Sequence, residues 1–433
     1  MKAAGRSFRA APLTSGFTPL LGALLLLGGP LAAQTWTTVN LHPAGSTSSR
    51  LTGLTATRQA GASDSHAGLW DGSAASFVNI QPAGVDTTYI NGVSASQQAG
   101  YSVTGGNLHA CIWNGTAASF VDLHPAGAVS SYAYGTDGTT QAGYYNTATE
   151  SHACIWTGTA ASFVDVSPAG STASQIMAST SGEQGGRIVV MSGLYHAGIW
   201  HGTAASFVDL APAGSTYSLV SATDGSTQAG YAIFGGITHA AIWHGTLASF
   251  ADIHPATAAS SSINAVSGAY QAGYAYFGGN SHAALWKGTP ASFVDLHAFL
   301  PAGYTTSSAN AIWTDGRFIV VAGSASNATR EEAFLWKTDL FPPQHRPVVT
   351  VKGRKLVTTT AAKLLIRGTA KDADGDLAKV QVKVGKRYRT AKGPPARWKF
   401  AVPLQPGTNK VLVRAVDEKG TFSKPVKLVI VRL

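Results

Sequence analysis

The sequence has few of the residues that usually carry covalent or charged chemistry. Only two cysteines, Cys111 and Cys154, and three methionines occur in 433 residues, and 12% of the residues are charged. Two cysteines are too few for the disulfide scaffold of a small secreted domain. The chain is nevertheless 45% apolar, which is enough for packed cores, and its length predicts more than one domain.

Long apolar segments are also absent. Residues 1–33 contain Lys2, Arg6 and Arg9, then an apolar stretch around residues 20–27, then small residues up to Ala33. This order is typical of a cleavable secretory signal peptide. Because the apolar stretch is far shorter than the roughly 20 residues that cross a bilayer, we expect no transmembrane segment. The mature protein is predicted to be secreted, either extracellular or periplasmic.

A repeat of 43 or 44 residues dominates the chain. The pentapeptide His-Ala-x-Ile/Leu-Trp begins at residues 66, 109, 152, 196, 239 and 282, and the variant EAFLW begins at residue 332. A fixed period of this length indicates a repeat architecture. Each period reads as four short strands, for example YINGVSAS, QQAGYSVT, HACIWNG and ASFVDLHPAG, with no helical period. Four strands per repeat predict one blade of a β-propeller, and a β-solenoid is the alternative.

The two ends of the repeat region complement each other. No segment like FVDLHPAG follows EAFLWKTDLFPP, whereas TWTTVNLHPAG stands at residues 35–45, after the signal peptide. The N-terminal strand is therefore predicted to complete the last blade and to close a ring of seven. We expect an all-β chain with a seven-bladed propeller over residues 34–340, a Pro-rich linker at 341–347 and a second domain over residues 348–433.

The repeat motifs resemble a known family. Ile-Asn, Ala-Gly-Tyr, His-Ala-x-Ile/Leu-Trp and Phe-Val-Asp-Leu are similar to the HAF repeats of bacterial extracellular proteins, which resemble Kelch-type propeller blades. The resemblance covers residues 35–340. It departs at the position after His-Ala, where the family's Phe is Gly, Cys or Ala in six copies and is kept only as Phe334. The resemblance implies an exported propeller and brings no catalytic residue with it.

The histidines and tryptophans of the pentapeptide are predicted to build the blades. A catalytic or metal site needs unlike partners that converge on one point, whereas residues repeated in every blade are spread around a ring. Strand alternation places Trp on one face and Ala on the other, each against a neighbouring blade. We expect Cys111 and Cys154, on the Trp face, to be free and buried. The repeat residues are His66, His109, His152, His196, His239 and His282, with Trp70, Trp113, Trp156, Trp200, Trp243, Trp286 and Trp336.

Two further repeat positions have predicted roles. An Asn or Asp recurs in every copy and is the expected acceptor for the pentapeptide histidine; the residues are Asn40, Asn79, Asp122, Asp165, Asp209, Asp252 and Asp295. Because Asn replaces Asp twice, the position is predicted to need an acceptor oxygen and not a charge. A second histidine, which Gln, Ser or Ala replaces in other copies, is predicted to be an exposed turn residue. The four copies that have it contain His42, His124, His254 and His297.

Binding is expected where the repeats differ. The first strand of each propeller blade normally lines the central channel, and there the copies carry an uncharged polar and aromatic collar. Side chains of this kind suit a sugar or a peptide, although a solvated channel wall without a ligand is the alternative. The collar consists of Asn91, Tyr134, Met177, Ser221, Asn264 and Asn310.

No catalytic constellation is evident, and no cofactor is expected. The sequence contains no phosphate loop, serine elbow or zinc-binding helix motif. The acids of residues 34–340 are few and mostly bound to the repeat; the exceptions include Glu150, Glu183, Asp315, Glu331 and Glu332. We therefore predict a non-catalytic exported protein that binds an extracellular glycan or protein. A polysaccharide hydrolase or lyase is the alternative.

The C-terminal region has a different composition. Residues 345–433 contain 21 Lys and Arg and 5 Asp and Glu, a net charge of +16, against −6 for the rest of the chain. Alternating runs predict six or seven strands of a β-sandwich. The segments GTAKDADGDLAKVQVKV and WKFAVPLQPGTNKVLVRAVDEKG resemble bacterial Ig-like domains. That resemblance implies a spacer or a surface anchor.

Two clusters of charge in this region have open interpretations. The basic side chains are either solvated or bind an anionic cell-surface polymer, and nucleic acid is not an expected partner outside the cell. They include Lys383, Lys386, Arg387, Arg389, Lys392, Arg397 and Lys399. Asp372, Asp374 and Asp376 form a weak calcium candidate, because Gly375 is not at the position that an EF-hand requires. An acidic turn without a metal is the preferred interpretation.

Overall fold

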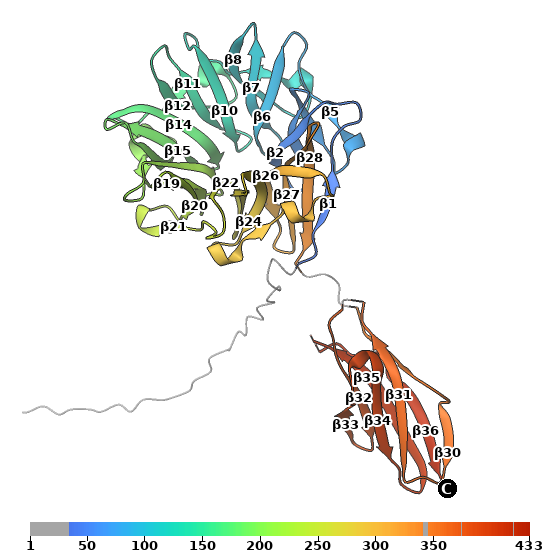
Figure 1. Ribbon diagram of the computed structural model, residues 1–433. Helices are drawn as coiled ribbons and strands as arrows, with labels where there is room; N and C mark the ends of the chain where they lie inside the picture. Colours follow the sequence, from blue (N-terminus) through green and yellow to red (C-terminus); the bar gives the residue numbers. More distant parts are fainter. Residues whose placement is uncertain (1–33, 341–344, 374, 419) are drawn as a thin grey trace, which may run out of the picture. The chain divides into compact units, whose positions relative to one another are not determined.

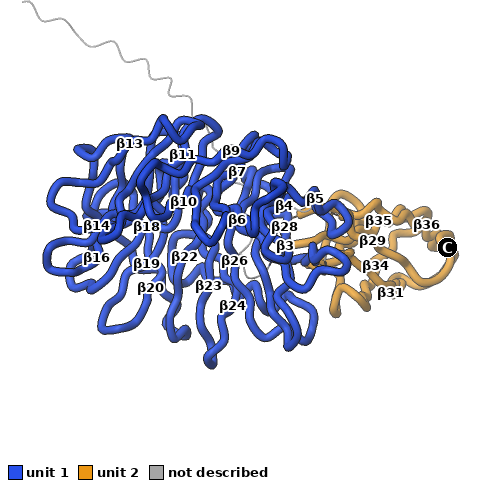
Figure 2. The backbone as a smooth tube through the Cα atoms, turned by 90° about the horizontal axis from the view of Figure 1, so that it is seen from above, with its two compact units in different colours: residues 1–340 blue, residues 341–433 orange. Residues whose placement is uncertain are grey.

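The computed structural model describes residues 34–340 and 345–433, apart from residues 374 and 419. The predicted signal peptide lies outside the described residues. The chain divides into two compact units, residues 1–340 and 341–433 (Figure 2). The described elements are strands and short 3-10 helices, and none of the described helices is long and apolar enough to cross a membrane.

The first unit is built from four-stranded antiparallel sheets. In one repeat, β6 (Thr87–Val93), β7 (Gln98–Thr104), β8 (Asn107–Trp113) and β9 (Val121–Asp122) pair in chain order. The same order recurs in β2 (Ser49–Leu54), β3 (Gln59–Ser63), β4 (His66–Trp70) and β5 (Val78–Asn79); in β10 (Ser130–Thr136), β11 (Gln141–Asn146), β12 (Ser151–Trp156) and β13 (Val164–Asp165); and in β22 (Ser260–Ser267), β23 (Tyr270–Phe277), β24 (Asn280–Trp286) and β25 (Val294–Asp295).

Two further repeats are joined into one eight-stranded sheet. A single parallel pair, Tyr195 with Tyr217, links β16 to β18. In one of these two repeats, strands β14 to β16 pair in order and β17 pairs with β16. In the other, strands β18 to β21 pair in order. The strands are β14 (Ser171–Thr180), β15 (Glu183–Val190), β16 (Tyr195–Trp200) and β17 (Val208–Asp209), and then β18 (Tyr217–Thr223), β19 (Gln228–Phe234), β20 (Ile237–Trp243) and β21 (Ala251–Asp252).

The last sheet takes its outer strand from the N-terminal side of the unit. The strands β26 (Tyr304–Thr314), β27 (Phe318–Asn327) and β28 (Glu331–Asp339) pair in order, and β1 (Thr37–Asn40) pairs antiparallel with β28. The N-terminal strand therefore pairs with the last sheet, as the complementary motifs predict.

The fourth strand of each repeat is shorter than predicted. In ASFVDLHPAG only Val121 and Asp122 pair, because the preceding residues form the 3-10 helix η3 (Ala117–Ser119). Ser119 Oγ closes that turn by donating to Thr116 O at 2.6 Å and accepting the Asn114 N–H at 2.8 Å. Equivalent short helices are η2 (Ala74–Ser76), η4 (Ala160–Ser162), η5 (Ala204–Ser206), η6 (Leu247–Ser249) and η7 (Pro290–Ser292), and η8 (His297–Phe299) follows β25.

The Phe of ASFVD explains the small residue after His-Ala. A Cβ atom added to Gly68 would lie 2.1 Å from the ring of Phe77, so the ring occupies that space. The last repeat has Thr38 of β1 at the position of this Phe, and there the pentapeptide carries Phe334, whose ring centroid lies 6.1 Å from that of Trp336. The last sheet therefore takes this aromatic ring from the pentapeptide strand, whereas the other repeats take it from the residue after their 3-10 helix.

The pentapeptide tryptophans join successive sheets. Each of the seven is at most 1% exposed. Trp70 Nε1 donates to Leu41 O at 2.9 Å, in the preceding sheet, and Trp200, Trp243 and Trp336 make the equivalent bond. Each buried indole contributes about 2 to 3 kcal/mol to stability. Cys111 and Cys154, on the same face, are buried and unpaired, as predicted.

The first strands of the sheets contact one another in a circle. β2 contacts β6, and the contacts continue through β10, β14, β18 and β22 to β26, which contacts β2. Figure 1 shows the sheets arranged around a common centre. The first unit therefore has a propeller-like arrangement, in which the first strands surround the centre.

The second unit consists of two sheets with one apolar core. One contains β29 (Val348–Val351), β31 (Lys363–Lys371) and β34 (Trp398–Pro403); the other contains β30 (Leu356–Thr359), β36 (Val426–Arg432), β35 (Gly407–Asp417), β32 (Leu377–Val384) and β33 (Arg387–Thr390). Ile366 and Trp398 of the first sheet pack with Val382 and Val413 of the second. The unit therefore has eight described strands, β29 to β36, rather than the six or seven that the sequence predicts. The short helix η9 (Pro395–Arg397) precedes β34.

Candidate functional site

The pentapeptide histidines lie beside the repeat aspartates, and the pairs brace turns. His109 Nδ1 lies 2.8 Å from Asp122 Oδ2, and Asp122 Oδ1 accepts the backbone N–H of His124 at 2.7 Å. Asn40 and Asn79 accept a backbone N–H in the same way, so Asn and Asp make the same contact with the backbone at this position. The equivalent contacts between His and Asp side chains are His152–Asp165, His196–Asp209, His239–Asp252 and His282–Asp295.

The second histidines are not exposed turn residues, so that prediction was wrong. His124 is half-buried, its ring stacks on His109 with 3.9 Å between centroids, and its Nδ1 lies 2.9 Å from Ser131 Oγ. Burial and the neighbouring His109 lower the pKa of His124. Because Gln, Ser or Ala replaces this His in other copies, its contact with the hydroxyl was not evident from the sequence. Gln81 makes the equivalent contact, in which its Oε1 accepts from the Thr88 hydroxyl at 3.1 Å. His42, His254 and His297 contact Ser49, Ser261 and Ser307 in the same way.

The collar residues occupy β-bulges in the first strands. Pairing with the second strand skips Asn91, between Ile90 and Gly92, and skips the equivalent residue in every repeat of the first unit. A bulged residue is left out of the ladder, so its side chain is free for another task. All of these residues are half-buried; they are Thr52, Asn91, Tyr134, Met177, Ser221, Asn264 and Asn310.

Four of the bulged residues connect one sheet to the next. Asn91 Nδ2 donates to Ala133 O at 3.1 Å, and Asn310 Nδ2 donates to Leu51 O at 2.9 Å. Thr52 and Asn264 donate to the equivalent carbonyls, at 2.5 and 3.0 Å. We call these bonds the inter-sheet links. Asn91, Asn264 and Asn310, which the sequence analysis places in the collar, therefore make structural contacts between sheets.

The bulged residues of three consecutive repeats form no inter-sheet link within the described chain; they are Tyr134, Met177 and Ser221. Ser221 Oγ is buried without a described hydrogen-bond partner. Tyr134 instead stacks on Tyr144, with 5.7 Å between centroids and 16° between planes. These three repeats are therefore the part of the first unit where the inter-sheet links are missing.

An arc of tyrosines lies in the first of these repeats and in the repeat before it. Tyr89 contacts Tyr101 at 5.0 Å, Tyr101 contacts Tyr132 at 5.3 Å, and Tyr132 contacts Tyr144 at 4.8 Å between ring centroids. With Tyr134 these rings form what we call the aromatic arc. Its members come from the first and second strands of two neighbouring sheets, and each is half-buried.

Arg50 contacts Tyr89 at one end of the aromatic arc, and Arg187 lies close enough to Tyr134 and Tyr144 at the other end to act on their pKa values. The guanidinium of Arg50 is 5.3 Å from the centroid of Tyr89. Arg187, on β15, lies 5.0 Å from Tyr195 and 5.1 Å from Tyr217, and it donates from Nε and Nη2 to Gln175 Oε1 at 2.9 and 2.6 Å.

Neither arc arginine has a carboxylate partner among the residues that the structure describes. The described arginines that form ion pairs are Arg58, Arg317 and Arg330. Burial raises the pKa of Tyr134, Tyr144 and Tyr231, although Arg187 acts in the opposite direction on all three. The phenols are therefore neutral at pH 7 and able to donate hydrogen bonds beside a positive charge.

The acids outside the repeat are engaged in local contacts. Glu183 is 5% exposed and accepts hydrogen bonds from Thr223 and from Gln228 Nε2. Asp315 accepts two backbone N–H groups in the turn before β27, and Glu331 accepts from Ser324 Oγ at 2.6 Å. Glu150 is exposed near His152. These groups lie in separate local structures.

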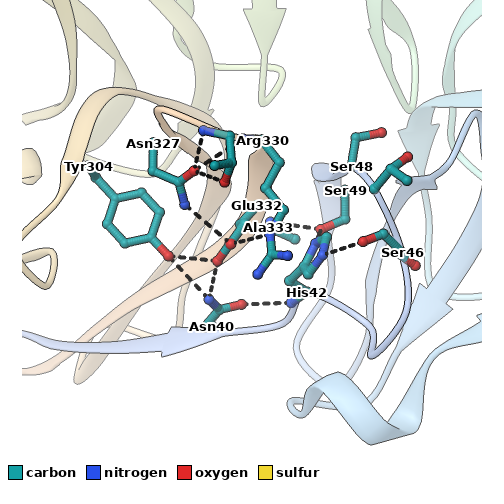
Figure 3. A network of polar contacts seen from close by, with 12 residues as sticks. Asn40, His42, Ser46, Ser48, Ser49, Tyr304, Asn327, Arg330, Glu332 and Ala333 are labelled. Atoms are coloured by element: carbon teal, nitrogen blue, oxygen red, sulfur yellow. Dashed lines mark hydrogen bonds and ion pairs between the residues drawn. The ribbon is translucent and has the colours of Figure 1, made fainter.

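Glu332 replaces the pentapeptide histidine in the last sheet and is the centre of a polar network (Figure 3). Its carboxylate accepts from Asn40 Nδ2 at 2.5 Å, Tyr304 Oη at 2.6 Å and Arg330 Nε at 2.6 Å. Burial opposes ionisation, yet these hydrogen bonds lower the pKa of Glu332 to about 2. Burial, and then the bond to Glu332, raise the pKa of Tyr304 to about 12.

A cleft of 560 Å³ adjoins this network, lined in part by His42, Ser46, Arg330 and Glu332. A carboxylate with a pKa of about 2 is a weak base at neutral pH. The network is therefore suited to joining β1 to β28. In it, Glu332 takes the place of the pentapeptide His and Asn40 takes the place of the repeat Asp.

Comparisons with known proteins give similarities of limited extent. No protein-family model matches the sequence, and no curated protein sequence matches it. The structure of a putative TolB from Agrobacterium tumefaciens is 10% identical, with 62% of this chain and 87% of that chain covered and a TM-score of 0.34. Trypanosoma rangeli sialidase in complex with sialic acid is 7% identical, with 92% and 88% covered and a TM-score of 0.34.

One similarity concerns a smaller part of the chain. Fibronectin(III)-like modules of Clostridium thermocellum CbhA are 19% identical, and this chain spans 62% of the length of that structure with 27% of its own residues, at a TM-score of 0.20. Similarities at these identities and TM-scores carry no functional conclusion.

The acidic segment of the second unit lies beside a third carboxylate, that of Asp417. Asp372 and Asp376 lie close together, whereas Asp374 is outside the described residues, and Asp417 from the end of β35 joins them. The predicted basic residues are exposed on β32 to β34 and their connections, apart from the half-buried Lys383.

Sequence reasoning missed the aromatic arc and Arg187. The signal that could have found them is the residue after Gln-Ala/Gly-Gly, since Tyr101, Tyr144 and Arg187 stand there in successive copies. This position pairs with the residue two before each bulge, so it lies beside the collar.

Proposed function

We propose that this is an exported, non-catalytic binding protein that recognises an acidic glycan through the aromatic arc and Arg187. Residues 34–340 form a closed seven-bladed propeller, and residues 348–433 form an Ig-like domain that serves as a spacer or surface anchor. The observation that carries the proposal is a guanidinium held among tyrosines, without a carboxylate partner among the described residues.

The propeller assignment is supported by the contacts between its two ends. β1 pairs with β28, the first strands contact in a circle, and Asn310 of the last sheet donates to Leu51 of the first. The Ig-like assignment is supported by the two sheets of the second unit and the core between them.

A glycan with carboxylate groups fits the chemistry of the arc. Tyrosine rings provide flat apolar surfaces with a polar edge, which suit the faces and hydroxyls of sugars. Arginine offers paired N–H donors that match a carboxylate. In its described bonds the guanidinium of Arg187 uses one N–H of Nε and one of Nη2, both to Gln175. Both N–H groups of Nη1 and the second N–H of Nη2 are therefore available for a bidentate bond to a carboxylate.

Binding is favoured over hydrolysis or a lyase reaction by the positions of the acids. A glycosidase generally uses two carboxylates about 5 to 9.5 Å apart that can reach the substrate. Glu183 and Glu332 are buried and hydrogen-bonded, and Asp315 caps a turn. Their contacts support structural roles for all three.

The proposal is tested by isothermal titration of the full chain with oligogalacturonate and, as a neutral counterpart, galactan oligosaccharide. Arg187→Gln is expected to weaken oligogalacturonate binding at least about tenfold, the effect of losing one charge-assisted bidentate bond. Tyr134→Ala should weaken it as well. The matched control is Arg58→Gln, which removes an exposed arginine paired with Asp71.

Several outcomes would count against the proposal. These are equal binding of the acidic and neutral sugars, full affinity in Arg187→Gln, and binding to acidic peptides alone. Cleavage of the glycan by the wild type, abolished in Glu183→Gln, would favour the hydrolase or lyase. Asn264 is unsuitable as a binding probe, because its side chain forms an inter-sheet link to Ala309.

A further inference from the structure

The second unit brings together three carboxylates from two separate segments. Asp372 directly follows β31, Asp376 directly precedes β32, and Asp417 is the last residue of β35. One carboxylate oxygen from each residue lies within 4.8 Å of the others. The acidic turn between β31 and β32 therefore faces the end of β35.

Asp417 is the decisive member of this group. Its residue exposure is 2%, and its Oδ1 accepts the backbone N–H of Thr421 at 2.7 Å. Its Oδ2 is buried and receives no hydrogen bond from any described residue. A buried carboxylate oxygen without a donor is unfavourable, and two further carboxylates nearby add repulsion. This position therefore calls for a positive group.

The carboxylates are held in place by the backbone around them. Asp417 N–H donates to Thr421 O at 3.2 Å, and Gly420 N–H donates to Asp417 O at 3.3 Å. Glu418 N–H donates to Asp376 O at 2.8 Å, which ties the two segments to each other. Gly375 has a φ of 78°, a left-handed conformation that glycine adopts without strain. The arrangement is therefore formed by the fold.

We infer that Asp372, Asp376 and Asp417 bind a calcium ion. The cluster offers oxygen ligands alone, which suit hard cations such as Ca²⁺ and Mg²⁺ and do not suit zinc or copper. Ca²⁺ accepts several carboxylates in flexible mono- or bidentate geometry, whereas Mg²⁺ keeps most of its waters and is usually bound by one or two carboxylates. Three protein carboxylates, one of them deeply buried, therefore favour Ca²⁺.

The ion would clamp the turn between β31 and β32 to the end of β35, and so join the two sheets of the second unit at one end. This site is independent of the aromatic arc. A failure of glycan binding leaves it standing, and its own failure leaves the proposed function standing.

The test is equilibrium dialysis of the EDTA-treated full chain against radioactive Ca²⁺, with calorimetric melting in parallel. One Ca²⁺ per chain is expected to bind. For an affinity typical of extracellular modules, 10 mM Ca²⁺ should raise the melting temperature of the second unit by at least about 5 °C. Asp417→Asn should abolish both effects, whereas the control Glu418→Gln, which changes an exposed neighbour, should retain them.

The variants separate an ion site from a purely structural aspartate. In EDTA, Asp417→Asn should melt at or above the wild-type temperature, because it removes a buried carboxylate oxygen without a hydrogen-bond partner among the described residues. A lower melting temperature for Asp417→Asn in EDTA, retained Ca²⁺ binding, tighter binding of Mg²⁺, or no binding by the wild type would each overturn the inference. Circular dichroism checks the fold, and Asp376→Asn decides the outcome if Asp417→Asn does not fold.

Discussion

Replacing Glu332 with glutamine is expected to remove a pH-dependent part of the stability of the first unit. The carboxylate is 3% exposed and links Asn40 of β1 to Tyr304 of β26 and to Arg330. Burial opposes its ionisation, but the three hydrogen bonds outweigh burial and lower the pKa of Glu332 from 4.5 to about 2. Glutamine preserves the size of the side chain and removes the titration.

The magnitude follows from the difference between the folded and unfolded pKa. A carboxyl group with a lowered pKa stabilises the folded state fully above its unfolded pKa, and it loses that contribution as the pH falls through the folded pKa. At about 1.4 kcal/mol per unit, a shift from 4.5 to about 2 corresponds to about 3 kcal/mol. About 2 kcal/mol of this should disappear between pH 5 and pH 3.

The assay is denaturant unfolding of the wild type and Glu332→Gln at pH 7, 5, 4 and 3. Tryptophan fluorescence reports mainly the first unit, because Trp398 is the one tryptophan of the second unit. The difference in unfolding free energy between the two proteins should shrink as the pH falls. The control Glu150→Gln replaces an exposed carboxylate outside this network. A constant difference for Glu332→Gln would refute the reasoning.

Three further predictions concern the framework. Deleting residues 34–45 removes β1 and should lower the melting temperature; an unchanged temperature would contradict closure by this strand. Asn310→Ala, which breaks an inter-sheet link, should cost about 1 kcal/mol in denaturant unfolding, and Ser221→Ala should cost less. Burial raises the pKa of the Cys111 and Cys154 thiols, so both should react with a disulfide reagent only after unfolding, and rapid labelling of the native protein would contradict this.

The parts of the fold that repeat were predictable from the sequence. Each copy served as a control for the others, so residues such as Trp113 and Asp122 could be assigned to the framework before any contact was known. The partner of the last repeat was also predictable, because a missing motif at one end stood complete at the other.

The candidate sites were not predictable to the same extent. The aromatic arc depends on strand register and on the bulges, which place Tyr132 opposite Tyr144 and free Tyr134 from the ladder. A bulge shifts the alternation of side chains by one residue, and the hydrophobic pattern does not report that shift. Asp417 lies far along the chain from Asp376, so no local motif connects them. The polar collar residues look alike in the sequence. Only their hydrogen-bond partners show that some, such as Asn310, form inter-sheet links and that others, such as Ser221, do not.

The pairing of β1 with β28 has a consequence for how the protein folds. Thr38 lies opposite Trp336, so this contact has a sequence separation close to the whole length of the unit. Contacts of such high order form slowly. During synthesis, β28 emerges last, and until then β1 has no partner and the first sheet exposes the face that β26 and β28 later cover. Unpaired strand edges of this kind promote aggregation, so the chain is expected to depend on a chaperone until residue 339 is available.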